Sequence, residues 1–149
     1  MKIIFLVVGL FLLNSSATSS VDLHEIIQLS DHIVFATVTD VCEDTVTATV
    51  LKTLKGEAGE SIDIQLHSTD LNINQSYDTN QNYIFFIENM KPRELRLLFS
   101  LKEYLDDKDD KSYILIDNKE VQLLKLMPFI HAVESYIYNE QEISLAQLN

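Results

Sequence analysis

Residues 31–56 read DHIVFATVTDVCEDTVTATVLKTLKG, and this stretch decides the fold class. Residues 33–41 form a nearly continuous apolar and β-branched run, which is typical of a strand buried on both faces. Residues 45–50 alternate between Thr and Val or Ala, which predicts a strand with one face toward solvent. The alternation slips at Leu51-Lys52, where a β-bulge would restore the phase and bend the strand. Two consecutive strands of this kind indicate a β-rich domain.

Two more strands are expected on either side of a long polar segment. Residues 62–66 alternate strictly between apolar and polar side chains, which predicts a third strand. Residues 68–82 are mostly polar and predict a loop, and loops of this length are more often functional or mobile than ordinary connections. Residues 83–87 read YIFFI and predict a fourth, fully buried strand.

The second half of the chain contains one ambiguous segment. Residues 95–105 fit a strand in one periodicity and a helix in another, and the surrounding β context favours the strand. An acidic turn at residues 106–111 leads into a hairpin, whose strands are expected at residues 113–116 and 121–124. With these strands, most of the chain is expected to be β.

A helix is expected at each end of this β-rich region. Asp22 is expected to cap a helix of two to three turns, with Glu25 completing a capping box and Val21 packing on Ile26. Pro128 suits the first position of a second helix. The apolar residues that recur at helical spacing in this second helix are Phe129, Ile130, Val133, Tyr136 and Ile137. The predicted fold is therefore mainly β with flanking helices, in one domain spanning residues 18–149.

The first 17 residues are expected to be removed from the mature protein. They comprise Lys2, an apolar run from Ile3 to Leu13 and a stretch of small residues, which is the pattern of a secretory signal peptide. Cleavage is expected after Ala17, or as late as residue 20. The apolar run is shorter than the roughly 20 residues that a bilayer-spanning helix needs. The sequence thus predicts an exported protein, periplasmic or extracellular, without a stable membrane span.

The charge excludes several classes of partner. The chain has 11 Lys and Arg against 23 Asp and Glu, a formal charge of −12, and loss of Lys2 with the leader makes it −13. A nucleic-acid-binding protein normally carries a basic patch, and a protein attracted to a membrane surface carries clustered Lys and Arg. The expected partner is therefore a protein or a small polar ligand and not a nucleic acid. The oligomeric state is left open.

The sequence contains no recognisable catalytic or metal-binding motif. His24 is followed by Glu25, but position 28 is Gln where a zinc-protease helix has its second His. The acidic run from Asp106 to Asp110 lacks the Gly and Glu of a calcium-binding loop, so a solvated turn is favoured and weak calcium binding is left open. No serine-nucleophile or Cys-x-x-Cys motif occurs. We expect no catalytic residue, no metal ligand and no cofactor.

Cys42 is the single cysteine of the chain, so no disulfide forms within one chain. The acidic residues that follow it disfavour the thiolate that a nucleophile needs. A half-buried free thiol is expected, and pairing between two chains is left open.

Several motifs within residues 22–88 resemble those of one known family. Ser30-Asp31 precedes the first strand, Leu54-Lys55-Gly56 closes the second, and residues 83–87 form a later strand. In this outline the chain resembles the netrin-like and tissue-inhibitor-of-metalloproteinases type of OB-fold domain, and the uncharacterised exported bacterial proteins that share it. The resemblance implies an OB-like antiparallel β-barrel, a fold that presents a binding face. The inhibitory members of the family chelate their target's zinc with an amino-terminal Cys. The predicted mature start of this chain has no Cys, so the resemblance does not extend to that mechanism.

We therefore expect a non-catalytic binding or interaction module. Its candidate binding surface is the 68–82 loop with the strand that follows, represented by Asp70, Asn74, Tyr77 and Tyr83. Two alternatives are left open. One is a metal-dependent hydrolase assembled from scattered acidic and His residues, and the other is a structural subunit of a cell-envelope assembly.

Overall fold

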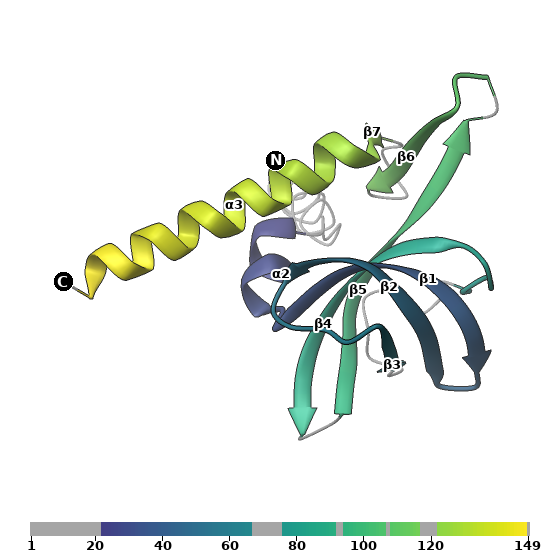
Figure 1. Cartoon of the computed structure of the whole chain (residues 1–149), viewed down its shortest axis with the longest axis horizontal. Helices are drawn as coiled ribbons and strands as arrows, with labels where there is room; N and C mark the ends of the chain where they lie inside the picture. Colours follow the sequence, from purple (N-terminus) through teal and green to yellow (C-terminus); the bar gives the residue numbers. More distant parts are fainter. Residues whose placement is uncertain (1–21, 67–75, 92–93, 107, 117–121, 149) are drawn as a thin grey trace, which may run out of the picture.

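The computed structural model describes residues 22–66, 76–91, 94–106, 108–116 and 122–148 (Figure 1). The predicted signal peptide and residues 68–75 of the predicted loop lie outside these ranges. In chain order the described elements are α2 (Leu23–Leu29), β1 (His32–Cys42), β2 (Thr45–Lys55), β3 (Ser61–Gln65), β4 (Asn82–Lys91), β5 (Glu94–Asp106), β6 (Lys111–Ile116), β7 (Gln122–Lys125) and α3 (Leu126–Gln147).

Five of the strands form a barrel-like ring. The sheet order is β3-β2-β1-β4-β5-β6-β7, with antiparallel neighbours. In addition, β3 pairs in parallel with β5, with Ile64 opposite Leu95 and Gln65 opposite Arg96. This pairing joins the two ends of the row β3-β2-β1-β4-β5. The predicted fold class, an OB-like β-barrel with flanking helices, is therefore confirmed.

Strand β5 belongs to the barrel and also to a smaller extension. Its residues 94–102 pair with β4, whereas residues 103–106 pair with β6. Because β7 pairs with β6, the end of β5 and these two strands make a three-stranded extension that projects from the barrel (Figure 1). The strand prediction for residues 95–105 is confirmed, and the helical alternative is excluded, since this segment is bonded to neighbouring strands along its length. The predicted hairpin is confirmed as β6 and β7.

The predicted β-bulge lies where the sequence pattern slips. Phe35 faces Lys52 and Ala36 faces Val50, so Leu51 is the extra residue of β2. Leu51 is exposed, whereas Val46 and Ala48 earlier in the strand are buried. The bulge therefore separates the alternating part of β2 from the part that leads to the Gly56 turn.

Strands β1 and β4 separate two hydrophobic cores. Ile84 and Phe86 of β4 pack with residues of α2 and α3 in the first core, while Tyr83, Phe85 and Ile87 pack in the second core inside the barrel. Because successive residues of a strand point to opposite faces, a strand between two cores needs apolar side chains throughout. This requirement explains the uninterrupted YIFFI run.

Helix α2 has a cap at each end. The Asp22 carboxylate accepts a hydrogen bond from the His24 backbone N–H at 3.0 Å, as the sequence predicts for the amino-terminal cap. At the carboxyl end, the Lys55 ammonium donates to the Ile27 carbonyl at 2.7 Å. Burial lowers the pKa of Lys55, and the nearby Asp31 carboxylate acts in the opposite direction. The two caps fix α2 against the start of β1 and the end of β2.

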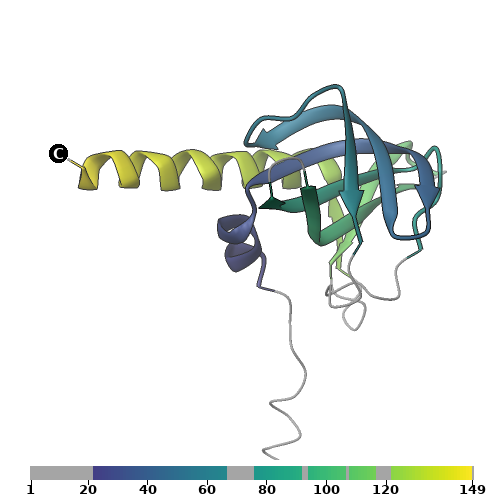
Figure 2. The ribbon, with the colours of Figure 1, turned by 90° about the horizontal axis from the view of Figure 1, so that it is seen from below.

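Helix α3 packs on the barrel with its first half only. Ile130, Val133 and Ile137 are buried there, as their helical spacing predicts, and Glu134 forms an ion pair with Lys52 of β2 at 2.9 Å. The second half extends past the barrel (Figures 1 and 2). Within the described ranges, neither helix combines the length and the apolar character that a bilayer-spanning helix requires.

Candidate binding surface

The predicted binding loop is described only at its carboxyl end. Asp70 and Asn74 lie outside the described residues, so their assignment stays a prediction. Tyr77 lies within the described part, and its hydroxyl is 2.7 Å from the Ser100 hydroxyl. Its ring centroid lies 5.2 Å from that of Tyr83. Tyr77 is half-buried and holds this end of the loop against the barrel.

Tyr83 is not a surface residue. Its side chain is fully buried on the face of β4 that also carries Phe85 and Ile87. Its hydroxyl accepts a hydrogen bond from the Asp78 backbone N–H at 3.0 Å, which satisfies this buried polar atom. The assignment of Tyr83 to the binding surface is therefore wrong, because the side chain is closed off from any external partner.

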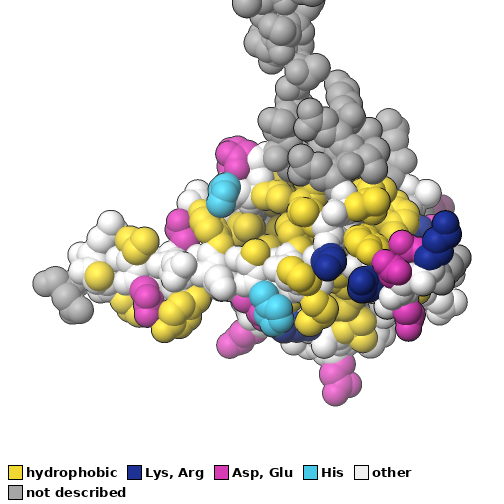
Figure 3. Space-filling model, turned by 90° about the horizontal axis from the view of Figure 1, so that it is seen from above, with side chains coloured by type: hydrophobic (Ala, Val, Ile, Leu, Met, Phe, Trp, Pro, Cys, Tyr) yellow, Lys and Arg dark blue, Asp and Glu magenta, His cyan; other side chains and the backbone are white. Residues whose placement is uncertain are grey.

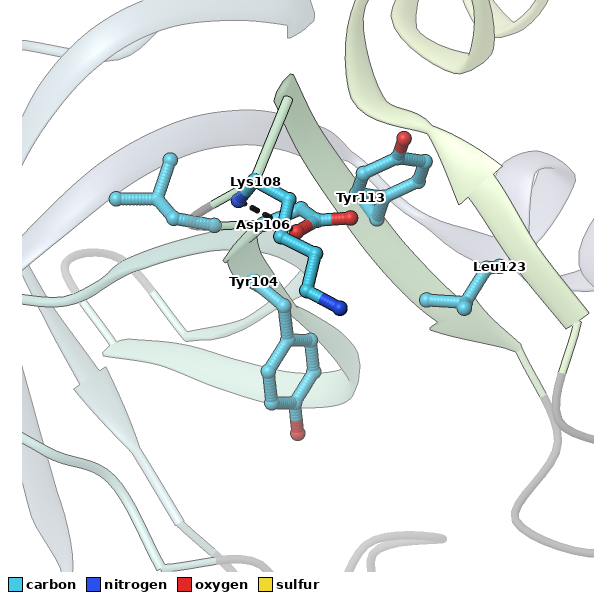
Figure 4. A pocket seen from close by; sticks show the side chains of 6 residues that line it. Tyr104, Asp106, Lys108, Tyr113 and Leu123 are labelled. Carbon is cyan, nitrogen blue, oxygen red and sulfur yellow. Dashed lines mark hydrogen bonds between the residues drawn. The ribbon is translucent and has the colours of Figure 1, made fainter. Parts of the chain in front are cut away.

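A different surface has the features of a binding site. The three-stranded extension carries an open hollow of about 500 Å³, here called the hairpin pocket (Figure 4). Its lining residues are Tyr104, Leu105, Asp106, Lys108, Tyr113 and Leu123. The volume falls within the range of ligand pockets. Because the pocket is open to one side, it suits a side chain that projects from a partner better than an enclosed small molecule.

The strand register brings the pocket residues together. Tyr104 of β5 lies opposite Tyr113 of β6, and Tyr113 lies opposite Lys125 of β7, so the three side chains share one face. Leu123 lies opposite Leu115, two residues further along β6 and on the same face. The result is two aromatic rings and a leucine on the side of the extension that holds the pocket.

The pocket residues are unusually exposed for their type. Leu105 is 70% exposed, Leu123 58% and Tyr104 42%, and Met127 at the start of α3 is 52% exposed. Figure 3 shows hydrophobic side chains gathered on the face that carries α3 and the hairpin, with Lys or Arg side chains among them. These exposed apolar side chains make the hairpin pocket a candidate interaction site.

Positive charge lies at this patch although the protein is acidic. The Lys108 side chain extends into the hollow between Tyr104 and Leu123 (Figure 4). The Lys102 ammonium lies 5.5 Å from the centre of the Tyr104 ring, and a hydrogen bond to Asp78 raises the pKa of this lysine. Lys102 is ion-paired with Asp78, so the cation that the pocket itself presents beside apolar surface is Lys108.

The acidic turn is held by its own backbone. The Asp106 carboxylate accepts a hydrogen bond from the Lys108 backbone N–H at 2.9 Å, and the Asp106 carbonyl accepts one from the Asp110 N–H at 3.0 Å. Residues 108–110 are exposed, as the prediction of a solvated turn requires. Among the described residues that line the pocket, Asp106 is the one carboxylate, and it shapes the turn that positions Lys108.

The described histidines and acidic residues do not converge on a metal site. His32 Nε2 lies 3.0 Å from Asn89 Oδ1, and His131 Nδ1 lies 3.3 Å from Glu134 Oε2. Over the described ranges, no group of three or more His, Cys, Asp or Glu side chains is arranged to hold a metal ion. His67 lies outside those ranges.

Cys42 is exposed, so the prediction of a half-buried thiol is wrong. The physical reason is the length of the β1–β2 hairpin. Strand β1 pairs with β4 only as far as Thr37, and beyond Val38 its side chains are exposed. Cys42 therefore sits near the end of the β1–β2 hairpin, where β1 pairs with β2 but no longer with β4.

Sequence reasoning missed the hairpin pocket, because its residues come from three strands and a turn. The sequence nevertheless contains a usable signal. Tyr104, Tyr113 and Leu123 are apolar residues on predicted strands, and other side chains of the same strands already supply the face toward the core.

A search of protein-family models found none that matches the chain, and a search of curated proteins found no relative.

Proposed function

We propose that the protein is an exported, non-catalytic binding module that uses the hairpin pocket to hold an apolar, negatively charged group of its partner. The observation that carries this proposal is the Lys108 side chain extending into an exposed hollow lined by Tyr104, Tyr113 and Leu123. Burying the two rings and the leucine supplies the hydrophobic driving force, at about 25 cal/mol per Å² of apolar surface. The lysine favours an anion at the edge of the contact.

The proposed binding surface is the hairpin pocket and not the carboxyl end of the 68–82 loop. Tyr77 and Tyr83 contact the barrel and each other, and their role is to fasten the end of the loop. The hairpin pocket lies instead on the extension beyond the barrel. The loop residues Asp70 and Asn74 stay as a secondary candidate surface.

Three features of the sequence support an exported binding module. The signal-peptide pattern of residues 1–17 supports export to the periplasm or the cell exterior. The resemblance of residues 22–88 to netrin-like domains supports a binding role, because OB-type barrels hold partners on an exposed face. The net charge argues against nucleic acid as the partner.

The anionic aromatic dye 8-anilinonaphthalene-1-sulfonate tests the pocket directly, since it combines an apolar ring system with one negative charge. We expect the folded protein to bind the dye with an increase in fluorescence. Leu123→Ser and Lys108→Glu should each lower this fluorescence at least about threefold, because they remove apolar area or reverse the charge.

Leu51→Ser is the matched control, because Leu51 is 54% exposed on β2 and lies outside the pocket. This variant should bind the dye like the wild type. Near-ultraviolet circular dichroism of each variant verifies that the fold is intact, since partly unfolded states also bind the dye. Equal loss of fluorescence in the pocket variants and in Leu51→Ser, or no loss in any of them, contradicts the proposal.

A further inference from the structure

The second half of α3 has no partner within its own chain. Residues 138–148, here called the helix end, are all exposed, and the buried residues of α3 stop at Ile137. The helix end is about 16 Å long, at 1.5 Å per residue. The packed first half of α3 nucleates the helix, but the helix end itself buries no apolar face that would add tertiary stabilisation.

The helix end carries apolar side chains that are costly to leave in solvent. Their exposed fractions are 62% for Tyr138, 59% for Ile143, 64% for Leu145 and 80% for Leu148. Tyr138, Glu142 and Leu145 follow the spacing i, i+4, i+7 and therefore lie on one face. This face has an acidic residue between two apolar ones, and the helix end contains no Lys or Arg.

The hairpin pocket combines apolar side chains with a lysine. Apolar side chains line the hollow beside the Asp106 carboxylate, which accepts from the Lys108 backbone N–H, and the Lys108 side chain extends into the hollow, with Lys125 on the same face of the extension. No ion pair joins either lysine to another residue within the described ranges. Helices commonly dock into apolar grooves through anchors spaced i, i+4 and i+7, and a charged pair at the edge fixes the register.

One molecule cannot bring these two surfaces together. Figures 1 and 2 show the end of α3 projecting from one side of the barrel, away from the β5–β6 hairpin. The first half of α3 is fixed to the barrel by Ile130, Val133 and Ile137. The helix end can therefore reach a hairpin pocket only in another molecule.

We infer that the helix end of one copy occupies the hairpin pocket of a second copy, so that the chain assembles head to tail. This inference rests on the proposed function and names a second copy of the chain as the partner. Tyr138 and Leu145 fill the hollow, and Glu142 lies beside Lys108. Such a contact joins two different surfaces, so it forms a ring if the rotation closes and an open row if it does not.

The contact is small, so the association is weak. One pocket and about three turns of helix bury less than the roughly 1,600 Å² of a standard interface, and a Kd on the order of 0.1 mM is expected. Sedimentation velocity of the purified protein up to about 1 mM, with a reductant to keep Cys42 unpaired, should show species that grow with concentration.

Two exposed-site variants separate the two surfaces. Leu123→Ser alters the pocket and Leu145→Ser alters the helix end, and each variant alone should be at least about tenfold weaker in self-association. Mixed in equal amounts, they should form a dimer and nothing larger, because each pair retains one intact pocket and one intact helix end. Leu51→Ser should associate like the wild type.

Charge reversal gives a second test that leaves the apolar side chains of both surfaces in place. Lys108→Glu and Glu142→Lys should each weaken association, whereas an equal mixture should restore it, because every contact between the two variants joins opposite charges. Persistence of association in Leu123→Ser with its loss in Leu145→Ser would mean that α3 pairs with α3, and would overturn the inference. A monomer at every concentration also overturns it. Because dye binding is measured on the monomer, that result does not depend on assembly.

Discussion

Replacing Gly56 by Ala is expected to lower the free energy of unfolding by about 2–4 kcal/mol. Gly56 has a φ of +74°, a left-handed conformation that a side chain disfavours. A β-carbon at this position would lie 2.3 Å from the Asp31 carbonyl oxygen and 2.6 Å from His32 Nδ1. The two strain effects act together, so the loss should exceed that of an ordinary surface substitution.

The strain cannot be relieved cheaply, because Asp31 is held in place. Its backbone N–H donates to the Ile87 carbonyl at 2.8 Å, and its carboxylate accepts from the Asn89 N–H at 2.7 Å. Moving the Asp31 carbonyl away from a new methyl group would weaken the junction between β1 and β4.

Gly59→Ala is the matched control in the same turn. A β-carbon at Gly59 meets no atom closer than the Ser61 carbonyl at 3.8 Å, and its φ lies outside the left-handed region. This variant should remain within about 0.5 kcal/mol of the wild type. Urea unfolding followed by far-ultraviolet circular dichroism measures both. Similar midpoints for the two variants would show that the Gly56 turn is not constrained as described.

Replacing Phe86 by Ala is expected to cost about 3–5 kcal/mol, a large fraction of the 5–15 kcal/mol that stabilises a typical domain. Phe86 is fully buried, opposite Ile33 on β1 and Phe99 on β5. Its ring centroid lies 5.7 Å from that of Phe99. The truncation leaves a cavity where the barrel meets α3, so the neighbouring side chains lose contacts that they cannot replace.

Leu105→Ala provides the comparison, since Leu105 is 70% exposed and also lies on β5. Its unfolding free energy should change by less than about 0.5 kcal/mol. The chain has no Trp, so the same urea titration can be followed by tyrosine fluorescence as a second probe. A loss below about 1.5 kcal/mol for Phe86→Ala would contradict the assignment of β4 to a wall between two cores.

The strands could be predicted because their burial is regular. Residues 33–38 and 83–87 are almost entirely apolar since both faces of β1 and β4 are covered there, and residues 45–50 alternate because one face of β2 is open. The bulge at Leu51 could be predicted as well, because the alternation of buried and exposed residues along β2 slips by one residue there. Parallel closure of the ring by β3 and β5 could not be predicted from periodicity, because no residue pattern specifies which strands meet.

The binding surface was harder to predict, since exposure depends on tertiary contacts. Tyr83 belongs to the predicted surface because its strand follows the 68–82 loop, whereas its alternation with Phe85 and Ile87 places it on an inner face. The hairpin pocket depends on the pairing of Tyr104 with Tyr113 and on the turn that places Lys108, and neither feature has a sequence motif. Because most residues of that turn are acidic, the sequence predicts a solvated turn and gives no indication that Lys108 lines a pocket.

Site-specific photo-cross-linking tests the binding role of the hairpin pocket most directly. A photoreactive phenylalanine analogue placed at Leu123, in protein produced by its own host, should form a covalent adduct larger than the monomer. The same analogue at Thr49, exposed on the outer face of β2, should form none. Mass spectrometry of the adduct then identifies the occupant: residues 138–148 of a second copy support head-to-tail assembly, and another protein supports the binding role alone. Adducts from Thr49 but none from Leu123 would contradict the proposal that the protein binds its partner through this pocket.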